Sequence, residues 1–308
     1  MIENSLWVEK YRPNTMDGYI GNDDVKSKVS RWLADNDIPN LLLSGKAGTG
    51  KTTLGKIIAK SLDCDLLYIN ASDENNVDTV REKIKGFAAT YGTAKWKIII
   101  LDESDFLTQN AQAAMRQVME AFSKHSRFIL TCNYVEKIID PIQSRCVHFQ
   151  IHPPSKNDVA RRCVEILNLE GVKFDTQSIV QIVNETYPDI RRTINALQRN
   201  SNNGKLELDE QSKFVANYMA KILEELKSKN DIKTMFKNIR QMIADSRVRT
   251  FDDLYRFLFD NLEEFAPEGK RAVCILQIAE SQYRSSFVVD KEIEVSALFI
   301  NLLKEIKG

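Results

Sequence analysis

The chain has 308 residues, of which 43% are hydrophobic and 28% charged, a composition that fits a globular protein of two or three domains. Its 43 basic and 43 acidic residues cancel, which excludes a strong global field for nucleic acid. Any such contact needs a local patch or a surface shared by several subunits. No apolar run has the length of a membrane span, and the first residues lack the apolar core of a signal peptide, so we expect an intracellular protein without a membrane partner.

A glycine-rich motif occupies residues 45–52, which match the pattern G-x-x-x-x-G-K-S/T. The short apolar run Leu41–Ser44 precedes it, and apolar residues at helical spacing follow it. Glycines let the backbone turn its N–H groups toward phosphate oxygens. Lys51 then reaches the β- and γ-phosphates, and the Thr52 hydroxyl ligates Mg²⁺. Strand, loop and helix in this order predict a site for a nucleoside triphosphate.

Apolar runs and helical patterns alternate between residues 41 and 151. One of the intervening helices is marked by Val77, Val80, Ile84 and Phe87. This alternation predicts an α/β fold with a parallel sheet and helices on both faces. The predicted strands are Leu41–Ser44, Leu66–Asn70, Ile98–Leu101, Phe128–Cys132 and Val147–Ile151.

Polar side chains follow two of these strands. Asp102 and Glu103 come after the apolar run Ile98–Leu101, and Asn133 comes after Phe128–Cys132. The carboxyl ends of parallel strands meet at the edge that also carries the phosphate loop. We therefore expect Asp102 to hold Mg²⁺ and Glu103 to activate the attacking water. Asn133 either hydrogen-bonds the γ-phosphate and that water, or is a turn residue at the end of a strand.

Arg145 stands just before the last predicted strand, in the segment Pro-Ile-Gln-Ser-Arg-Cys at 141–146. It is either a solvated surface arginine or an arginine finger that reaches the nucleotide of a neighbouring subunit. Such a finger stabilises charge on the transferred phosphoryl group and is worth about 10³–10⁵ in rate.

The five cysteines include no C-x-x-C pair, which fits a reducing compartment and argues against a zinc module. A metal site at Cys146 and His148 is the weaker interpretation, because their segment alternates like a strand. A free buried cysteine is the better one.

The pattern changes after His152-Pro153-Pro154. Ser155 and Asp158 resemble a capping box that opens a helix, and helical patterns follow at 156–169, 176–186 and 189–200. From about residue 212 the pattern is helical throughout, which predicts a bundle without a catalytic cluster. Its apolar stripes are Leu254, Phe257, Leu258 and Leu262, and Ala297, Ile300 and Leu303.

Several motifs occur along the chain in a fixed order: Trp7-Val8-Glu9-Lys10-Tyr11-Arg12-Pro13, the phosphate loop, Asp102-Glu103, Asn133, Ser144-Arg145-Cys146 and Asp189-Ile190-Arg191-Arg192. Together they resemble the small subunits of sliding-clamp loaders, both replication factor C small subunits and the T4-type phage clamp-loader ATPase subunit. The resemblance is strong over about residues 6–200 and implies an AAA+ fold. It implies an α/β P-loop ATPase domain with a parallel sheet flanked by helices at 1–154, an all-α lid at 155–211 and an all-α collar at 212–308.

The resemblance also implies roles for individual residues. Asn133 becomes a first sensor, Arg191 a second sensor on the lid, and Arg145 a finger, so that the catalytic set is Lys51, Glu103, Asn133 and Arg145. The nucleotide-binding set is Val8, Glu9, Lys10, Tyr11 and Ile20 around adenine and ribose, and Gly45, Gly48, Thr49, Gly50, Lys51, Thr52, Thr53 and Arg191 around the phosphates.

Contacts outside the nucleotide site are less determined. Arg81 and Lys85 lie four apart and either contact the DNA backbone or form a solvated basic face. Arg116 either meets a neighbouring subunit's nucleotide or pairs locally with Glu120. Phe106 and Leu107 either dock a clamp or pack in the core.

The activity that the resemblance implies is a DNA-stimulated ATPase that uses ATP and Mg²⁺. Its partners are other loader subunits (a pentamer of four ATPase copies and a companion), a sliding clamp and primer–template DNA. ATP binding assembles a spiral that opens the clamp, and hydrolysis releases it.

Two alternatives remain, namely a branch-migration helicase-type motor and a non-hydrolysing ATP-dependent scaffold. One departure from cellular relatives, Ser104 in Asp-Glu-Ser-Asp in place of Asp-Glu-Ala-Asp, favours a viral origin. The expected location is the cytoplasm of a bacterium or a phage-infected host, or the nucleus in a eukaryote.

Overall fold

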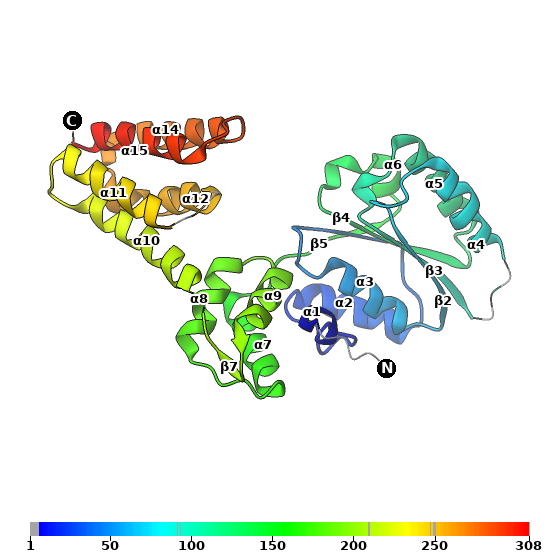
Figure 1. Cartoon of the computed structure of the whole chain (residues 1–308). Helices are drawn as coiled ribbons and strands as arrows, with labels where there is room; N and C mark the ends of the chain where they lie inside the picture. Colours follow the sequence, from blue (N-terminus) through cyan, green and yellow to red (C-terminus); the bar gives the residue numbers. More distant parts are fainter. Residues whose placement is uncertain are drawn as a thin grey trace. The chain divides into compact units, whose positions relative to one another are not determined.

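The computed structural model describes residues 6–90, 92, 94–208, 210–246, 248 and 251–307. Residues 1–5 and 308, at the ends of the first and last predicted domains, lie outside the described residues. The described residues fall into two compact units, and the boundary along the chain lies between Glu207 and Leu208 (Figure 1). Among them, no helix is both long and apolar enough to cross a membrane.

The first unit is built on a five-stranded sheet in the order β2-β3-β4-β1-β5, with every neighbouring pair parallel. This confirms the α/β fold class. The observed strands begin up to two residues earlier than predicted, because pairing with neighbours extends them beyond the apolar runs. Their bounds are Leu41–Ser44 for β1, Cys64–Asn70 for β2, Trp96–Asp102 for β3, Ser126–Cys132 for β4 and Val147–Gln150 for β5.

Alternate side chains of the strands bury on opposite faces of the sheet, as the two-residue period of a strand requires. Leu41 and Leu43 join the core under α2 and α3, whereas Leu42 joins the core under η1, α4, α5 and α6. In Figure 1 these helix groups lie below and above the sheet. Their bounds are Asp23–Ala34 (α2), Lys51–Lys60 (α3), Thr79–Ile84 (η1), Lys85–Ala89 (α4), Gln109–Ala121 (α5) and Asp140–Gln143 (α6).

The helix predicted from Val77 to Phe87 begins as a π-helical turn, η1, and continues as α4. Its fully buried positions are Val80, Ile84 and Ala88, a strict four-residue repeat. An α-helix has 3.6 residues per turn, so this repeat would drift around it. The wider π turn closes i→i+5 bonds and keeps the three side chains on the sheet.

Three helices follow the sheet: α7 (Lys156–Leu169), α8 (Thr176–Thr186) and α9 (Ile190–Asn200). Each begins at a side-chain cap, Ser155, Asp175 or Asp189, that accepts the N–H three residues on. The caps explain why the helical patterns were predictable at this accuracy. A small antiparallel pair, β6 (Ser201–Asn202) and β7 (Lys205–Leu206), ends the unit, and its N-terminal helix is α1 (Trp7–Lys10).

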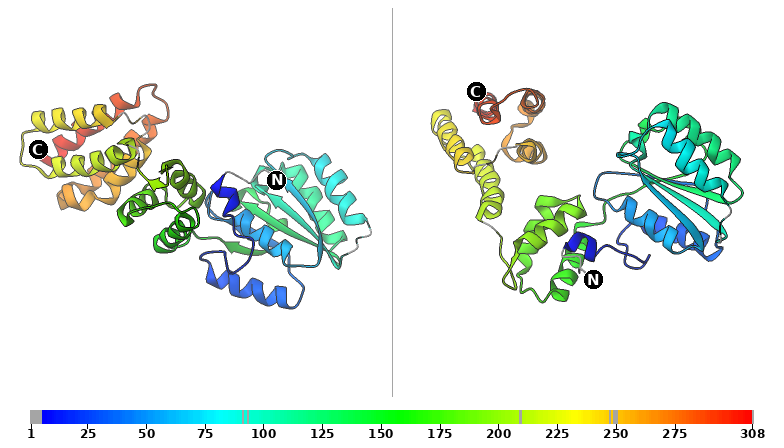
Figure 2. Two further views of the ribbon diagram at one scale, coloured as in Figure 1. Left: turned by 60° about the horizontal axis from the view of Figure 1, so that its bottom comes forward. Right: turned by 45° about the vertical axis from the view of Figure 1, so that its right-hand side comes forward.

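The second unit is helical where it is described, as predicted, and Figure 2 shows it as packed helices. Leu254, Leu258 and Leu262 are buried in its core. Of the second predicted stripe Leu303 is buried, but Ala297 and Ile300 are exposed, so those two predictions are wrong. The core side of that helix is instead Val295, Leu298, Phe299, Leu302 and Leu303. The helices are α10 (Glu210–Lys227), α11 (Ile232–Ser246), α12 (Asp252–Asp260), α13 (Leu262–Phe265), α14 (Arg271–Ser285) and α15 (Lys291–Lys307).

Candidate active site

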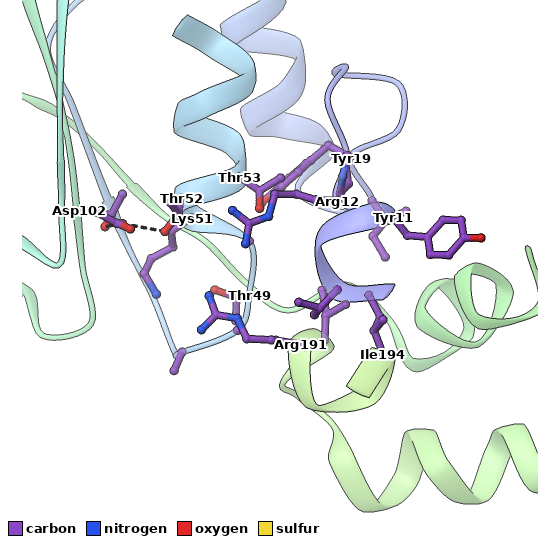
Figure 3. A pocket seen from close by; sticks show the side chains of 18 of the residues that line it. Tyr11, Arg12, Tyr19, Thr49, Lys51, Thr52, Thr53, Asp102, Arg191 and Ile194 are labelled. Atoms are coloured by element: carbon purple, nitrogen blue, oxygen red, sulfur yellow. Dashed lines mark hydrogen bonds between the residues drawn. The ribbon is translucent and has the colours of Figure 1, made fainter. Parts of the chain in front are cut away.

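A cavity lies at the carboxyl edge of the sheet, in the first unit (Figure 3). Several segments far apart in sequence line it: the N-terminal segment, the phosphate loop, the end of β3, the end of β4, Arg162 of α7 and the start of α9. The lining includes Val8, Tyr11, Ile20, Ala47 to Thr53, Asp102, Glu103, Asn133 and Arg191. The structure thus brings together most of the nucleotide-site residues that were predicted from the sequence.

The phosphate loop adopts a backbone that requires glycine at two close approaches. Gly45 has φ 151° and Gly48 has φ 74°, where other L-residues are strained. A Cβ on Gly45 would lie 2.4 Å from the Ile151 carbonyl oxygen, and one on Gly48 would lie 2.0 Å from Asp189 Oδ1. The Gly48 carbonyl also accepts the Ile190 N–H at 3.2 Å. The loop is therefore in direct contact with the start of α9.

Lys51 begins α3 and is buried beneath the loop. Its ammonium group donates to the carbonyls of Gly45 and Lys46, each at 2.8 Å, and to Asn133 Oδ1 at 2.9 Å. Burial lowers the pKa of Lys51, and nearby acidic groups, Asp102 among them, oppose that shift. A phosphate group would supply further negative charge to this buried cation.

Asp102 links the phosphate loop to the neighbouring strands. Its Oδ1 accepts the Thr52 hydroxyl at 2.6 Å and the Thr131 hydroxyl at 2.5 Å, and its Oδ2 accepts the Tyr68 hydroxyl at 2.8 Å. Figure 3 shows the contact between Thr52 and Asp102. Two adjacent hard oxygen ligands are what Mg²⁺ takes from protein when phosphates and water complete its octahedron. These residues therefore fit a Mg²⁺ site.

Glu103 follows in a left-handed conformation, with φ 55°, and its N–H donates to Thr131 Oγ1 at 3.0 Å. A short 3₁₀ turn, η2 (Ser104–Phe106), comes next. Ser104 is fully buried, and its hydroxyl donates to the Leu101 carbonyl at 2.8 Å. Ser104, which departs from the family pattern, is therefore buried and hydrogen-bonded to the strand that precedes it.

Arg191 extends from the first turn of α9 toward the phosphate loop (Figure 3). Arg12 extends into the same cavity, although the sequence analysis assigned it no role. Arg162 of α7 also lines it and donates to the Tyr11 carbonyl at 3.0 Å. Arg12 could have been found, because it belongs to the Glu-Lys-Tyr-Arg-Pro motif, whereas nothing in the local sequence marks Arg162.

The N-terminal motif divides into two groups. Val8, Tyr11 and Ile20 line the cavity, although the Tyr11 ring points away from the loop and its hydroxyl donates to Glu170 at 2.7 Å. Glu9 and Lys10 are not among the residues that line it, so their place around adenine and ribose stays a prediction. Both side chains form ion pairs instead, Glu9 with Arg12 at 2.6 Å and Lys10 with Glu170 at 2.9 Å.

Arg145 lies away from its own cavity. It stands before β5, at the amino edge of the sheet, whereas the phosphate loop follows β1 at the carboxyl edge. The two edges are roughly 13 Å apart for four residues at about 3.3 Å each. The Arg145 side chain is 35% exposed. Its guanidinium group donates to the Pro141 carbonyl at 2.6 Å and pairs with Glu120, which also lies 3.9 Å from Arg116.

Arg81 and Lys85 are exposed and line a shallow groove between η1, α4 and α5, together with Arg116. This combines the two predicted DNA contacts with a residue that was expected at a subunit interface. Phe106 is 50% exposed, which leaves it accessible for docking. Leu107 is 5% exposed and packs in the core.

The cysteines do not form a site in the described residues. Burial raises the pKa of both Cys132 and Cys146 to about 12, so both thiols are protonated at neutral pH. Among the described residues, no group of three or more His, Cys, Asp or Glu side chains could hold a metal ion. The Ser44 hydroxyl lies 2.7 Å from His148 Nε2 and gives that histidine an ordinary partner.

Comparisons with known proteins agree with this geometry. Residues 41–153 match the family "ATPase family associated with various cellular activities (AAA)", and residues 155–210 match "Sliding-clamp-loader large subunit, AAA+ ATPase lid domain". Fold, cavity and both matches define an AAA-class P-loop ATPase with a clamp-loader lid.

Curated relatives resolve the family further. The replication factor C small subunit of Sulfurisphaera tokodaii is 34% identical over 97% of this chain and 95% of its own length. That of Halobacterium salinarum is 36% identical over 96% and 95%, and that of Archaeoglobus fulgidus is 46% identical over 64% of each chain. The chain belongs to the replication factor C small subunit family. These relatives are archaeal and give no support to the expected bacterial or phage setting.

Among solved structures, the Thermotoga maritima RuvB Holliday junction branch migration motor matches with a TM-score of 0.58. It is 16% identical and covers 74% of this chain and 85% of its own. A likeness at this identity shows a shared fold alone. It therefore does not favour the branch-migration alternative over the clamp-loader family.

Proposed function

We propose that this chain is the ATPase subunit of a sliding-clamp loader, hydrolyses ATP with Mg²⁺, and is stimulated by primer–template DNA. The observation that carries this proposal is the convergence of Lys51, the Thr52–Asp102 pair, Glu103 and Asn133 on one cavity of a replication factor C family member. These are the groups that phosphoryl transfer needs, because its catalysis consists mainly of positioning and charge stabilisation.

Each group has one proposed task at the nucleotide. Lys51 neutralises the β- and γ-phosphates, Thr52 and Asp102 hold Mg²⁺, and Glu103 accepts a proton from the attacking water. Bound Mg²⁺ would neutralise charge that develops on the phosphates. Asn133, at the end of β4, and Arg191, on α9, contact the γ-phosphate in this proposal. The close approach of Gly48 to Asp189 supports coupling between the phosphate loop and α9. Val8, Tyr11 and Ile20 bound the adenine end.

Arg145 completes the pocket of a neighbouring subunit in this proposal. Its place at the far edge of the sheet keeps it from its own nucleotide, and its partial exposure leaves it accessible to another copy. ATP bound between subunits then tightens a spiral that opens the clamp, and hydrolysis releases it. The proposed stoichiometry is a pentamer of four ATPase copies and one companion, acting in the cytoplasm.

The helical second unit is proposed as the collar that joins the copies. It carries several exposed apolar side chains near the turn between α14 and α15, which supports burial against a neighbour. These are Tyr283, Phe287, Val289 and Ile293. The proposed domains are 1–154, 155–211 and 212–308.

Arg81 and Lys85 are proposed to contact the DNA backbone, because they border one groove with Arg116 and no carboxylate is among the described residues that line it. Arg116, which lies 3.9 Å from Glu120, stays proposed for a contact between subunits. Phosphate contacts carry no base information, so recognition should be independent of sequence. Replacing Arg81 and Lys85 with glutamine should weaken DNA binding at every sequence tested and reduce its salt dependence by about two phosphate contacts. Lys83, which pairs with Glu74 beside the groove, is the control.

A steady-state ATPase assay with primed DNA, a sliding clamp and the candidate companion subunits tests the function. The proposal expects turnover that rises when DNA and clamp are both present. A non-hydrolysing scaffold would bind ATP and assemble without turnover, although the Asp102–Glu103 pair argues against it. Strand separation without a clamp would favour the motor alternative.

A further inference from the structure

Asp105 is a buried carboxylate for which the proposed mechanism has no use. It lies on η2, two residues after Glu103, and only 7% of it is exposed. It forms no ion pair with a basic side chain among the described residues. A buried carboxylate without a direct ion pair is costly. The nearby Lys51 ammonium offsets that cost only through its charge, without a contact. Asp105 lies between the two segments that carry the proposed base and the proposed sensor.

One oxygen of this carboxylate holds the end of the neighbouring strand. Asp105 Oδ2 accepts the backbone N–H groups of Asn133 and Tyr134, each at 3.3 Å. Two consecutive amides directed at one oxygen fix the orientation of the peptide units around Asn133. The direction of its side chain follows, and its Oδ1 accepts the Lys51 ammonium at 2.9 Å.

The same turn is held at a second point. The Glu103 N–H donates to Thr131 Oγ1 of β4, whereas Asp105 accepts the N–H of Asn133, the residue that follows β4. Gln112 joins the following residues of the two loops, with its amide on the carbonyls of Leu107 and Lys137. Of these links, only Asp105 reaches the backbone of Asn133 itself.

The other oxygen, Asp105 Oδ1, is buried without a hydrogen-bond donor among the described residues. Buried acceptors without partners are rare in native proteins and need an explanation. A cost of this kind is tolerated where a group serves a functional constraint. Here that constraint is the fixed separation between the segment that carries Glu103 and the segment that carries Asn133.

We infer that Asp105 is a positioning residue for ATP hydrolysis, which sets the Asn133 carboxamide relative to Glu103 and Lys51 through two backbone amides. This inference rests on the proposed function, since it assigns a task within the same site. The proposed role assigns Asp105 no contact with phosphate or with the attacking water, only with the two backbone amides. Its effect should therefore pass through Asn133 and disappear when the Asn133 side chain is absent.

The test is a double-mutant cycle in the full chain, assembled with its partner subunits, clamp and primed DNA. Asp105→Ala should lower the single-turnover hydrolysis rate about tenfold to hundredfold, less than the 10²–10³ lost with a direct transition-state donor. ADP affinity should change less than about twofold, because the phosphate loop is intact. Asp105→Asn keeps an acceptor for both amides and should recover most of the rate.

The cycle separates positioning from a general loss of structure. In an Asn133→Ala background, Asp105→Ala should cost less than about twofold more, because two residues that act as one unit are not additive. Ser104→Ala is the matched control. It removes a buried hydroxyl from the same turn, but that hydroxyl donates to the Leu101 carbonyl of β3 and makes no contact with the segment of Asn133. It should leave the rate unchanged.

Full additivity with Asn133→Ala, a wild-type rate for Asp105→Ala, or an equal loss in Ser104→Ala would each overturn the inference. If Asp105→Ala does not fold, Asp105→Ser carries the cycle, because its shorter hydroxyl cannot reach both amides. If the wild-type chain binds ATP without hydrolysing it, the proposed function fails. The cycle is then measured as the ratio of ATP to ADP affinity, which Asp105→Ala should lower only when Asn133 is present.

Discussion

The guanidinium group of Arg145 is hydrogen-bonded to the carboxylate of Glu120 in the same chain. The pair lies at the edge of the sheet opposite the phosphate loop, and about a third of the arginine side chain is exposed. Glu120 thus holds the proposed finger in place before any neighbour arrives. The pair is partly exposed, and contacts of this kind contribute little energy compared with a finger on a transferring phosphate.

This difference in magnitude gives the first prediction. Glu120→Gln should change turnover of the assembled protein less than about fivefold, since an exposed ion pair is worth about 0.2–1 kcal/mol. Arg145→Ala should lower turnover about 10³-fold, since it removes the finger. Turnover is measured at saturating ATP with DNA and clamp. Equal effects of the two substitutions would mean that Arg145 acts only through its pair with Glu120.

Thr131 gives the second prediction, because its buried hydroxyl joins Asp102 to the Glu103 backbone. Thr131→Val keeps the shape but leaves a buried carboxylate oxygen and a buried N–H with fewer partners. It should cost about 1–3 kcal/mol in the free energy of unfolding and raise the Mg²⁺ concentration needed for half-maximal turnover. Thr131→Ser keeps the hydroxyl and should behave like the wild type. Identical unfolding curves for the valine and serine variants would contradict this role.

Gly48 gives the third prediction. An alanine there adds a Cβ 2.0 Å from Asp189 Oδ1 and costs about 1–2 kcal/mol for its left-handed backbone. Gly48→Ala should therefore displace the start of α9 and weaken ATP binding at least about tenfold by titration calorimetry. Adding Asp189→Ser should recover part of the affinity, because serine still caps the helix but is shorter. Gly86→Ala, which meets no atom within 4 Å, is the control.

Glu170 gives the fourth prediction, which concerns pH. Hydrogen bonds from Tyr11 and then Lys10 hold the pKa of Glu170 below its ordinary value of 4.5. A carboxyl with a depressed pKa stabilises the fold above its unfolded pKa and loses that contribution as the pH falls through its folded pKa. The wild type should thus have a higher melting temperature than Glu170→Gln at pH 7, and the difference should decrease as the pH falls from 4.5 through the lower folded pKa of Glu170. Glu165→Gln, which breaks a pair within α7, is the control. A difference that stays the same at every pH below 4.5 would contradict the assignment.

How far the sequence could predict the molecule depended on the range of the interactions. The strands and the helices α7 to α9 were predictable, because apolar periodicity and caps are local signals. The gathering of Asp102 and Asn133 beside the loop followed from the rule that parallel strands end at one edge. The π turn at Val80 and Ile84 was not predictable, because the apolar residues that mark this helix in the sequence, Val77, Val80, Ile84 and Phe87, have the three- and four-residue spacing of an ordinary α-helix.

Contacts between distant segments were the part that sequence could not give. Lys10 pairs with Glu170, 160 residues later, and Arg145 pairs with Glu120, 25 residues earlier, so no local sequence pattern predicts either ion pair. The apolar residue Ile300 was misassigned because a helix with apolar residues on several sides has more than one stripe that could face the core.

The most direct test of the account mixes two inactive variants, since its central claim is that Arg145 acts on the nucleotide of a neighbouring copy. Arg145→Ala and Glu103→Gln proteins are each assayed alone and then together, with DNA and clamp. The account predicts that the mixture regains turnover, because some interfaces combine an intact Glu103 with an intact Arg145. No recovery in assemblies that contain both variants, or DNA-stimulated turnover by Arg145→Ala alone at the wild-type rate, would contradict it.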